Sequence, residues 1–198
     1  RALNRVGRCG SPVYQAILKE GYGMKSGVDY WKDGLEIVKK DAVSWMIATF
    51  VAYLLCMIPG VGIVSLFHMA EKGKKGEKVS INDALFGLQK LVPSLIAGII
   101  FMIPMCICGL PILYFGPQMI WAFAMIARGE ETDGIAAIKK SMALVKEKGG
   151  FGAVFMPWLL CGILSGIGSV ACYVGALFTI PCGVIGYDNM YDDLKGGG

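Results

Sequence analysis

The sequence predicts an all-α integral membrane protein: a polytopic bundle of three helical hairpins, about six membrane helices, each hairpin preceded by an interfacial amphipathic helix. Three observations predict it. Long stretches of the chain carry no charge, basic residues are concentrated between those stretches, and a short motif recurs at fifty-residue intervals. Of the 198 residues, 55% are hydrophobic and only 17% are charged. A soluble domain has about a quarter charged residues, so the composition excludes an ordinary soluble enzyme, a disordered chain and a small disulfide-bonded fold.

The apolar stretches define the membrane segments. Residues 42–70, 91–127 and 149–187 contain no Asp, Glu, Lys or Arg and are 29, 37 and 39 residues long, whereas one span needs about 20 residues. Cytoplasmic segments of membrane proteins carry the excess of Lys and Arg. Because a basic segment flanks each stretch, every stretch must enter and leave the membrane by the same face, as a hairpin does. We therefore expect both termini in the cytoplasm and the protein in the bacterial inner (cytoplasmic) membrane.

The domain organisation follows from the same pattern. Residues 1–28 form a basic cytoplasmic N-terminal arm, and residues 29–195 form a single membrane domain. That domain is expected to contain three pseudo-repeats, 29–75, 80–128 and 132–190.

The interfacial helices are predicted from the recurring motif. Asp33–Lys40, Asp83–Lys90 and Asp133–Lys140 share an acid, a small residue, spaced aliphatic residues and a final lysine. We expect each copy to begin its helix with the acid and to end it with the base, as the helix macrodipole favours. Ser80 with Asp83 resembles a capping box. The apolar residues recur at helical spacing, which favours short amphipathic helices at the membrane interface.

Each apolar stretch is expected to turn at a Gly- or Pro-rich break. The breaks are Pro59–Gly62, Cys108–Pro111 and Gly166–Ser169. The first hairpin is short on its return side, so three forms are considered: a hairpin extended to about residue 75, a re-entrant arm, or one long kinked span over 43–70. The charge pattern favours the hairpin.

His68 is the one ionisable side chain inside the apolar stretches and the only histidine of the chain. An intramembrane ionisable group is a candidate functional residue, and His68 is therefore the candidate cofactor-binding residue, as a ligand to heme or a chlorophyll-like pigment. A single histidine excludes an intrachain bis-histidine site. The alternative is an interfacial histidine beside Glu71.

Two further sets of residues are candidates for contacts. Small residues let membrane helices approach closely, and the third hairpin contains such residues at helical spacing: Gly162, Gly166, Gly168 and Gly175. Lysines beside a membrane are attracted to anionic headgroups, and the candidates are Lys39, Lys40, Lys72, Lys74, Lys75, Lys139 and Lys140. The basic residues are divided among short segments and interleaved with acids, so a nucleic acid is not an expected partner.

No catalytic constellation or metal motif is present. Asp188, Asp192 and Asp193 are the only acids that an enzyme could use. Asp188 and Asp192 lie at i and i+4 on a helix and are interpreted as a solvated face, with a bridging divalent cation as the alternative.

Several short motifs resemble a group of bacterial integral membrane families of unknown function. These families are similar to the membrane domain attached to some glycerophosphodiester phosphodiesterases. The motifs are Gly76–Asp83, Arg128–Glu131, Ala136–Ser141, Thr179–Pro181 and Tyr191–Leu194. The resemblance covers about residues 40–198 and implies a helical membrane domain. It implies no activity here, because the chain contains no soluble phosphodiesterase domain.

The leading functional expectation is a non-catalytic structural or accessory membrane protein, such as a subunit of a larger membrane complex. Its expected partners are the bilayer, partner membrane subunits or a second copy of the chain, and no cofactor is required. The alternatives are a transporter or channel for a small solute or lipid, using a broken helix at Gly116–Gln118, and a pigment- or heme-binding subunit that uses His68.

Overall fold

The computed structural model describes residues 24–106, 110–148, 150–171 and 173–196. All regular secondary structure in this part of the chain is helical, and it contains no strand. The predicted all-α class is therefore confirmed, whereas most of the predicted N-terminal arm lies outside the described residues. The helices are α2 (Gly27–Lys40), α3 (Ala42–Leu55), α4 (Val61–Lys74), α5 (Ile81–Ala84), α6 (Phe86–Gln89), α7 (Leu91–Cys106), α8 (Leu110–Met119), α9 (Trp121–Ala127), α10 (Gly134–Glu147), α11 (Gly150–Ala171) and α12 (Tyr173–Gly196).

The first apolar stretch forms two helices, α3 and α4, and not one long kinked span. Helix α3 ends at Leu55, and α4 begins at Val61 after Gly60, whose φ of 80° suits glycine. Helix α4 then continues to Lys74, as the extended form of the hairpin requires. Each arm has 14 residues and is therefore about 21 Å long, less than the roughly 30 Å of a hydrocarbon core.

The helices that carry the repeated motif differ in their register. Asp133 is the N-cap of α10 and accepts hydrogen bonds from the backbone of Ile135 and Ala136. Ser80 is the N-cap of α5, where it forms a capping box with Asp83. The expectation is wrong for α2, which begins at Gly27 because Ser26 caps it, so Asp33 lies inside the helix.

The C-terminal ends of these helices also depart from the motif. Lys40 ends α2 and Lys90 follows α6, but α10 continues past Lys140 to Glu147. The second copy is divided into the two short helices α5 and α6. The repeated acid-to-lysine motif therefore predicts that a helix is present, but it does not predict the residues at which the helix begins and ends.

Of the predicted breaks, the one at Gly166–Ser169 is wrong, and the one at Cys108–Pro111 lies partly outside the described residues. Helix α11 passes through Gly166–Ser169 and ends at Ala171, so the expected turn there is wrong. Glycine is tolerated in a long apolar helix when a neighbouring helix packs against it, as α12 does here at Gly168. The break at Cys108–Pro111 falls partly on residues 107–109, which are not described.

Gly116–Gln118 does not form a broken helix. It lies inside α8, and the amide of Ile120 donates to the carbonyl of Gly116 at 3.0 Å, which carries the helical path toward α9. Pro117 is accommodated within the helix.

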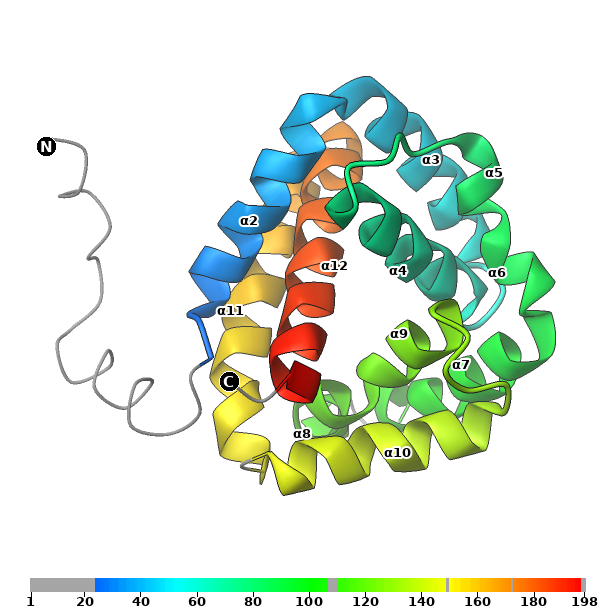
Figure 1. The fold of residues 1–198 in the computed structure, drawn as a ribbon, viewed down its shortest axis with the longest axis vertical. Helices are drawn as coiled ribbons and strands as arrows, with labels where there is room; N and C mark the ends of the chain where they lie inside the picture. Colours follow the sequence, from blue (N-terminus) through cyan, green and yellow to red (C-terminus); the bar gives the residue numbers. More distant parts are fainter. Residues whose placement is uncertain (1–23, 107–109, 149, 172, 197–198) are drawn as a thin grey trace, which may run out of the picture.

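In chain order we divide the helices into three groups, which we call units: α2–α4, α5–α9 and α10–α12; Figure 1 shows them arranged in a ring. The last helix of each unit, α4, α9 or α12, lies at the centre, and these three helices contact one another. The first helices, α2, α5–α6 and α10, lie around them; we call these the rim helices.

Each rim helix packs on another unit. Helices α5–α6 pack on the first unit and α10 packs on the second, whereas α2 packs on the third unit and so closes the ring. A Cβ at Gly34 of α2 would collide with the carbonyl of Cys182 in α12, and a Cβ at Gly87 of α6 would collide with the carbonyl of Val61 in α4. Ser141 of α10 donates a hydrogen bond to the carbonyl of Gln118 in α8 at 2.6 Å. The ring is therefore held by close backbone contacts between units that are distant in sequence.

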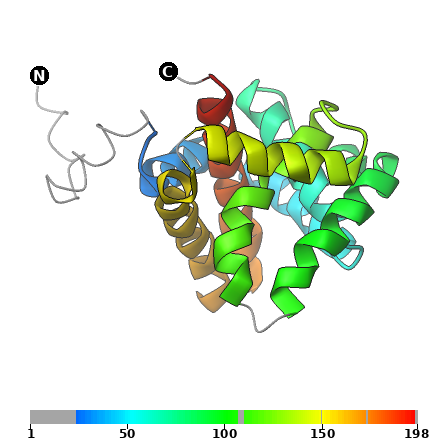
Figure 2. The ribbon, with the colours of Figure 1, turned by 90° about the horizontal axis from the view of Figure 1, so that it is seen from below.

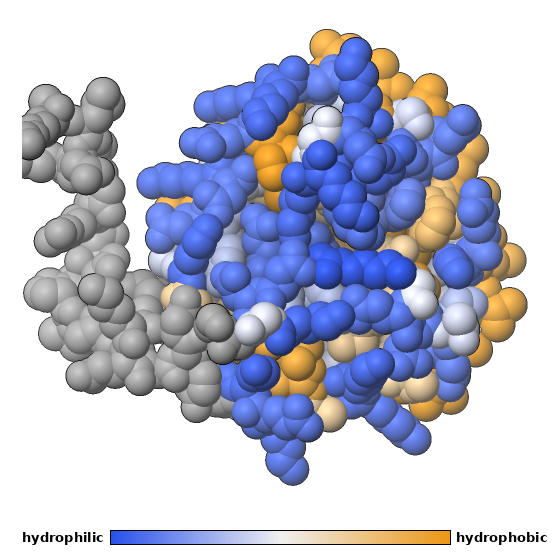
Figure 3. All heavy atoms as spheres, in the orientation of Figure 1, coloured by the Kyte–Doolittle hydropathy of each residue, from blue (hydrophilic) through white to orange (hydrophobic). Residues whose placement is uncertain are grey.

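The molecule has one polar face and an apolar periphery. Figure 3 shows hydrophilic residues over the face formed by the rim helices, with hydrophobic residues at its edge. Helices α7, α8 and α11 extend away from this face, on which α10 and the end of α12 lie (Figure 2). Their outer surfaces and that of α3 expose large hydrophobic side chains, among them Val43, Phe50, Leu54, Val92, Ile99, Ile103, Met156, Ile163 and Ile167.

Within the described residues, one helical segment, Gly150–Gly168, is long and apolar enough to cross a membrane, and only 17% of its apolar window is buried inside the protein. The other apolar helices are shorter: Ala42–Leu55, Leu91–Pro104 and Pro111–Ala127. By this measure one helix of the described residues could cross a membrane, so the expected bundle of about six membrane helices is not confirmed.

Candidate functional site at the polar face

His68 lies in α4 and is half-buried. Its ring stacks on Phe86 with 3.8 Å between the ring centroids and 9° between the planes. Its Nε2 atom is 3.7 Å from Oδ1 of Asp83, which also accepts a 2.8 Å hydrogen bond from Nζ of Lys72. The nitrogen that a heme or pigment would need is thus directed at a carboxylate that connects α4 to α5.

The candidate headgroup lysines divide into two groups. Four donate to carboxylates of the protein: Lys72 to Asp83, Lys74 to Asp188 and Asp192, Lys75 to Glu71 and Lys140 to Glu131. Lys74 points inward, because its side chain is only 18% exposed. Lys39, Lys40 and Lys139 are exposed and have no ion-pair partner among the described residues.

The candidate packing glycines have different surroundings. Gly168 and Gly175 face each other across α11 and α12: a Cβ on Gly168 would lie 2.5 Å from the carbonyl oxygen of Gly175. A Cβ on Gly162 would lie 2.9 Å from the Tyr187 hydroxyl, whereas none of the described atoms lies within 4 Å of a Cβ on Gly166.

A cluster of four charged side chains lies where the three central helices meet. Lys74 ends α4, Arg128 follows α9, and Asp188 and Asp192 are one turn apart on α12. Arg128 spans both acids: Nη2 donates to Asp188 at 2.8 Å and Nη1 to Asp192 at 2.5 Å. Lys74 also donates to both acids, to Asp188 at 2.8 Å. We call these four residues the central charged cluster.

The interpretation of both acids as a solvated face is wrong for Asp188, whose side chain is 1% exposed. The carboxylate is covered because the ends of α4 and α9 bring their cations against α12. Sequence reasoning found Asp188 but not its partners. A signal existed, since Arg128 and Asp188 are the first charged residues after the second and third apolar stretches and have opposite signs.

The two acids differ electrostatically because they differ in burial. Burial raises the pKa of the Asp188 carboxyl above its ordinary value, against the attraction of Lys74 and Arg128. Asp192 is 44% exposed. Burial raises its pKa less than hydrogen bonds from Arg128 and Lys74 lower it, so the net direction is down. The charged form of Asp188 therefore depends more on the neighbouring Lys74 and Arg128 than the charged form of Asp192 does.

A second layer of contacts surrounds the cluster. The Tyr191 ring lies 4.9 Å from the Arg128 guanidinium, and its hydroxyl donates to Glu130 at 2.6 Å. Lys195 donates to the same carboxylate at 2.8 Å. These hydrogen bonds lower the pKa of the Glu130 carboxyl against the opposing effect of burial. The end of α12 is thereby tied to the loop after α9.

On another side of α12, the hydroxyl of Tyr30 donates to Asp193 at 2.5 Å, and the Tyr30 side chain is fully buried. Of the three acids of the tail, Asp188 and Asp192 therefore bind cations of the central helices and Asp193 accepts a bond from α2. All three carboxylates join helices.

The central charged cluster contains two positive and two negative side chains, so its charges balance. Breaking a buried ion pair by removing one partner leaves an uncompensated charge and is strongly destabilising. Among the described residues, no three His, Cys, Asp or Glu side chains come together as a metal site requires. The arrangement is chemically suited to hold the three central helices together.

Comparison of the chain with protein-family models, curated proteins and solved structures gives no match. The resemblance to membrane families of unknown function therefore rests on short sequence motifs alone.

Proposed function

We propose that this protein is a non-catalytic integral membrane protein that serves as a structural or accessory subunit of a larger membrane complex. We place it in the bacterial cytoplasmic membrane with both termini in the cytoplasm. One observation carries the membrane assignment: large apolar side chains of α3, α7 and α11 face outward around a ring whose one face is polar.

The burial of α11 argues against a soluble protein. The core helix of a soluble protein is mostly buried, whereas 17% of the apolar window of α11 is buried. Contiguous exposed apolar surface marks a membrane or protein contact, and leaving a large apolar side chain in water forfeits about 1.5–3 kcal/mol of burial free energy. Lipid or a partner subunit would cover this surface.

The central charged cluster supports a structural role. Lys74, Arg128, Asp188 and Asp192 are bonded to one another, and their bonds connect the ends of the three central helices. A general acid or base must exchange a proton with a substrate within hydrogen-bond reach. Side chains that are held in mutual ion pairs are better suited to fixing the helices.

The proposal is tested in two steps. Membranes from expressing cells are washed with alkaline carbonate, and the protein is expected to stay in the pellet; release into the supernatant would contradict an integral location. The protein is then purified from its native membranes in a mild detergent. A partner present in stoichiometric amount is expected, whereas a chain that purifies alone and mediates solute flux in proteoliposomes would contradict the accessory role.

A further inference from the structure

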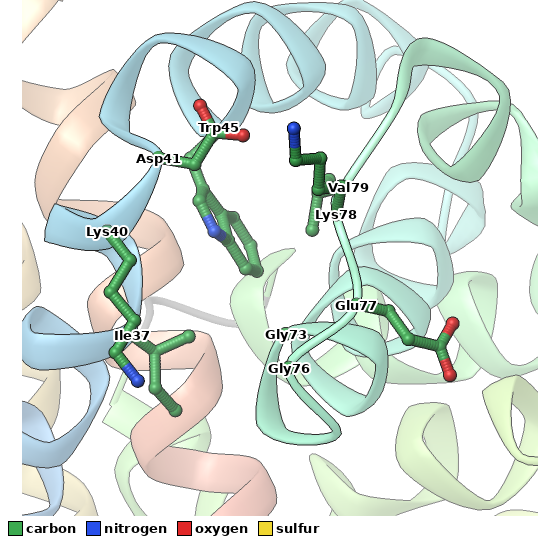
Figure 4. A pocket seen from close by; sticks show the side chains of 9 residues that line it. All are labelled: Ile37, Lys40, Asp41, Trp45, Gly73, Gly76, Glu77, Lys78 and Val79. Atoms are coloured by element: carbon green, nitrogen blue, oxygen red, sulfur yellow. The ribbon is translucent and has the colours of Figure 1, made fainter.

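Two hollows in the described part of the structure have contrasting walls. One, of about 420 Å³, opens on the polar face beside Trp45 (Figure 4). The Lys40 side chain lies at one end of it and Lys78 lies with Asp41 at the other, so its charges are divided between two ends. The other hollow, of about 380 Å³, is lined by apolar side chains of α7, α8 and α10. We call it the apolar groove, and of the two it alone has a wall of a single chemical kind.

The apolar groove runs along α8, away from the polar face. Met119 at the end of α8 lines it beside Ile138 of α10, whereas Pro111 lines it near the start of α8. Figure 2 shows α7 and α8 extending away from α10, which lies across their ends nearer the polar face. The eight residues from Pro111 to Met119 correspond to about 12 Å of helix. The groove would therefore cover most of one leaflet of a hydrocarbon core, which is roughly 15 Å deep.

The wall of the groove determines what can fill it. A bound water needs two to four polar partners, and this wall supplies almost none. An empty groove would forfeit dispersion contacts along its lining. Ile103, which borders the groove, is 53% exposed, so the groove is open to its surroundings. In a membrane, a lipid chain or the side chains of a partner helix would therefore occupy it.

The volume of the groove favours a chain over a helix. About 380 Å³ along about 12 Å corresponds to roughly 30 Å² in cross-section. A helix about 10 Å across needs roughly 80 Å². A partner helix could therefore only cover the groove, whereas a single acyl chain can lie inside it.

The end of the groove at α10 is positively charged. Lys139 and Lys146 are exposed and have no ion-pair partner among the described residues. Lys139 lies three residues before Met142 and Lys146 four residues after it, so both share the side of α10 on which Met142 borders the groove. Lys140 lies on another side of the helix and donates to Glu131 at 2.7 Å. Two unpaired lysines, one turn to either side of Met142, thus attract an anionic headgroup to this end.

We propose that the apolar groove binds one acyl chain of an anionic phospholipid, such as phosphatidylglycerol, whose headgroup lies at the α10 end beside Lys139 and Lys146. The chain would follow α8 into the membrane, and the headgroup would stay at the polar face. This inference rests on the proposed membrane location. It adds Lys146 and a defined acyl-chain site to the headgroup contact predicted at Lys139.

Native mass spectrometry of the full chain in detergent tests the groove, with phosphatidylglycerol added in increasing amounts. Ile103→Trp places an indole in the groove and should weaken binding about ten-fold, because loss of about ten van der Waals contacts has an effect of that size. Met102→Trp is the matched control, since Met102 is 43% exposed on the same helix and does not border the groove. Unchanged binding in Ile103→Trp would overturn the groove as the acyl-chain site.

Phosphatidylethanolamine with the same acyl chains tests the role of charge. Wild type is expected to bind phosphatidylglycerol more tightly. Lys139→Gln and Lys146→Gln should each weaken phosphatidylglycerol binding about five-fold and change phosphatidylethanolamine binding less. Lys140→Gln, the control, removes the same charge from another side of α10 and should leave both affinities unchanged. Equal affinity of wild type for the two lipids would overturn the anionic class, and displacement of the lipid by equimolar glycerol phosphate would overturn the contribution of the acyl chain.

The membrane location and the lipid site fail in different ways. Release of the protein by alkaline carbonate would count against the membrane location itself. Retention in the membrane, combined with lipid binding that is insensitive to Ile103→Trp, would leave that location standing and remove only the lipid site. Loss of a stoichiometric partner from Ile103→Trp, without any change in lipid binding, would assign the groove to the partner and overturn the lipid.

Discussion

At the scale of single residues, Asp188 is the acid on which the contacts between the central helices depend. Its side chain is buried between Arg128 and Lys74, which belong to two other parts of the chain. A buried carboxylate is stable only when its lost hydration is replaced by charge-assisted hydrogen bonds. Asp188 is therefore a structural residue, although two acids one helical turn apart would ordinarily be assigned to a solvated surface.

We expect Asp188→Asn to destabilise the protein by about 3–5 kcal/mol, because it leaves two cations partly buried with half their counter-charge. Thermal unfolding in detergent, followed by circular dichroism, measures the effect. Glu36→Gln is the control, since Glu36 is exposed and has no ion-pair partner among the described residues. Equal melting temperatures of wild type and Asp188→Asn would contradict the role assigned to the cluster.

At the scale of helices, α11 and α12 approach closely at Gly168 and Gly175. No local signal of the sequence separates these two glycines from Gly166, which lies two positions before Gly168 in α11 and has open space beside it. The space beside Gly168 and beside Gly166 differs because only one side of α11 faces α12.

Gly168→Ala is expected to destabilise the protein by about 1–3 kcal/mol, since the new methyl group would collide with Thr179 and the backbone of Gly175. Gly166→Ala should be neutral or slightly stabilising, because alanine is the better helix former and its methyl group meets open space. Denaturant titration of both variants compares them directly. If both lost the same stability, close packing at Gly168 would not be the cause.

The connection between α4 and α5 should depend on pH. Asp83 faces Lys72 and His68 and accepts hydrogen bonds from Ser80. Burial acts to raise its pKa, but the hydrogen bonds from Lys72 and Ser80 outweigh burial and lower it. A lowered carboxyl pKa gives stability that is complete above the ordinary value of about 3.9 and is lost as the pH falls through the lower native value.

Asp83→Asn should therefore be less stable than wild type at pH 7, by about 1–2 kcal/mol. The gap should close as the pH falls below about 3.9. Unfolding of both proteins between pH 7 and pH 2.5 provides the measurement. A gap of constant size over this range would show that the charge of Asp83 is not what stabilises the connection.

At the scale of the whole molecule, the ring places its charges on one face and its apolar side chains around the periphery. The ends of α4, α9 and α12 meet on the polar face through the central charged cluster. In a membrane, this arrangement would place all three basic segments on one side, as the hairpin topology requires.

Cysteine labelling tests that topology in a variant from which the native cysteines have been removed. In sealed inverted vesicles, Glu77→Cys and Thr132→Cys should react with a membrane-impermeant maleimide, since both positions are exposed and lie in the charged segments between the apolar stretches. Met57→Cys, at an 85% exposed position between α3 and α4, should react only after the vesicles are opened. Reaction of Glu77→Cys and Thr132→Cys from opposite sides would exclude the hairpins.

The sequence by itself determined the features that depend on a few neighbouring residues. The helical class, the break between helices at Pro59–Gly62, the N-cap Asp133 and the capping box at Ser80 all follow from side chains within about one turn of the backbone they act on. The exclusion of charge from long stretches likewise indicated apolar helices, because hydropathy is a property of composition.

Only the tertiary structure decided which charges pair and where the close contacts lie. Lys74 and Asp188 are 114 residues apart, and Arg128 is 60 residues from Asp188. These side chains meet because three helices are placed around one centre. The charge pattern alone would also allow each of them to bind a lipid headgroup or water instead. The burial of Asp188, the inward turn of Lys74 and the cavity beside Trp45 follow from that placement, because burial is a property of neighbouring helices and not of the segment that carries the residue.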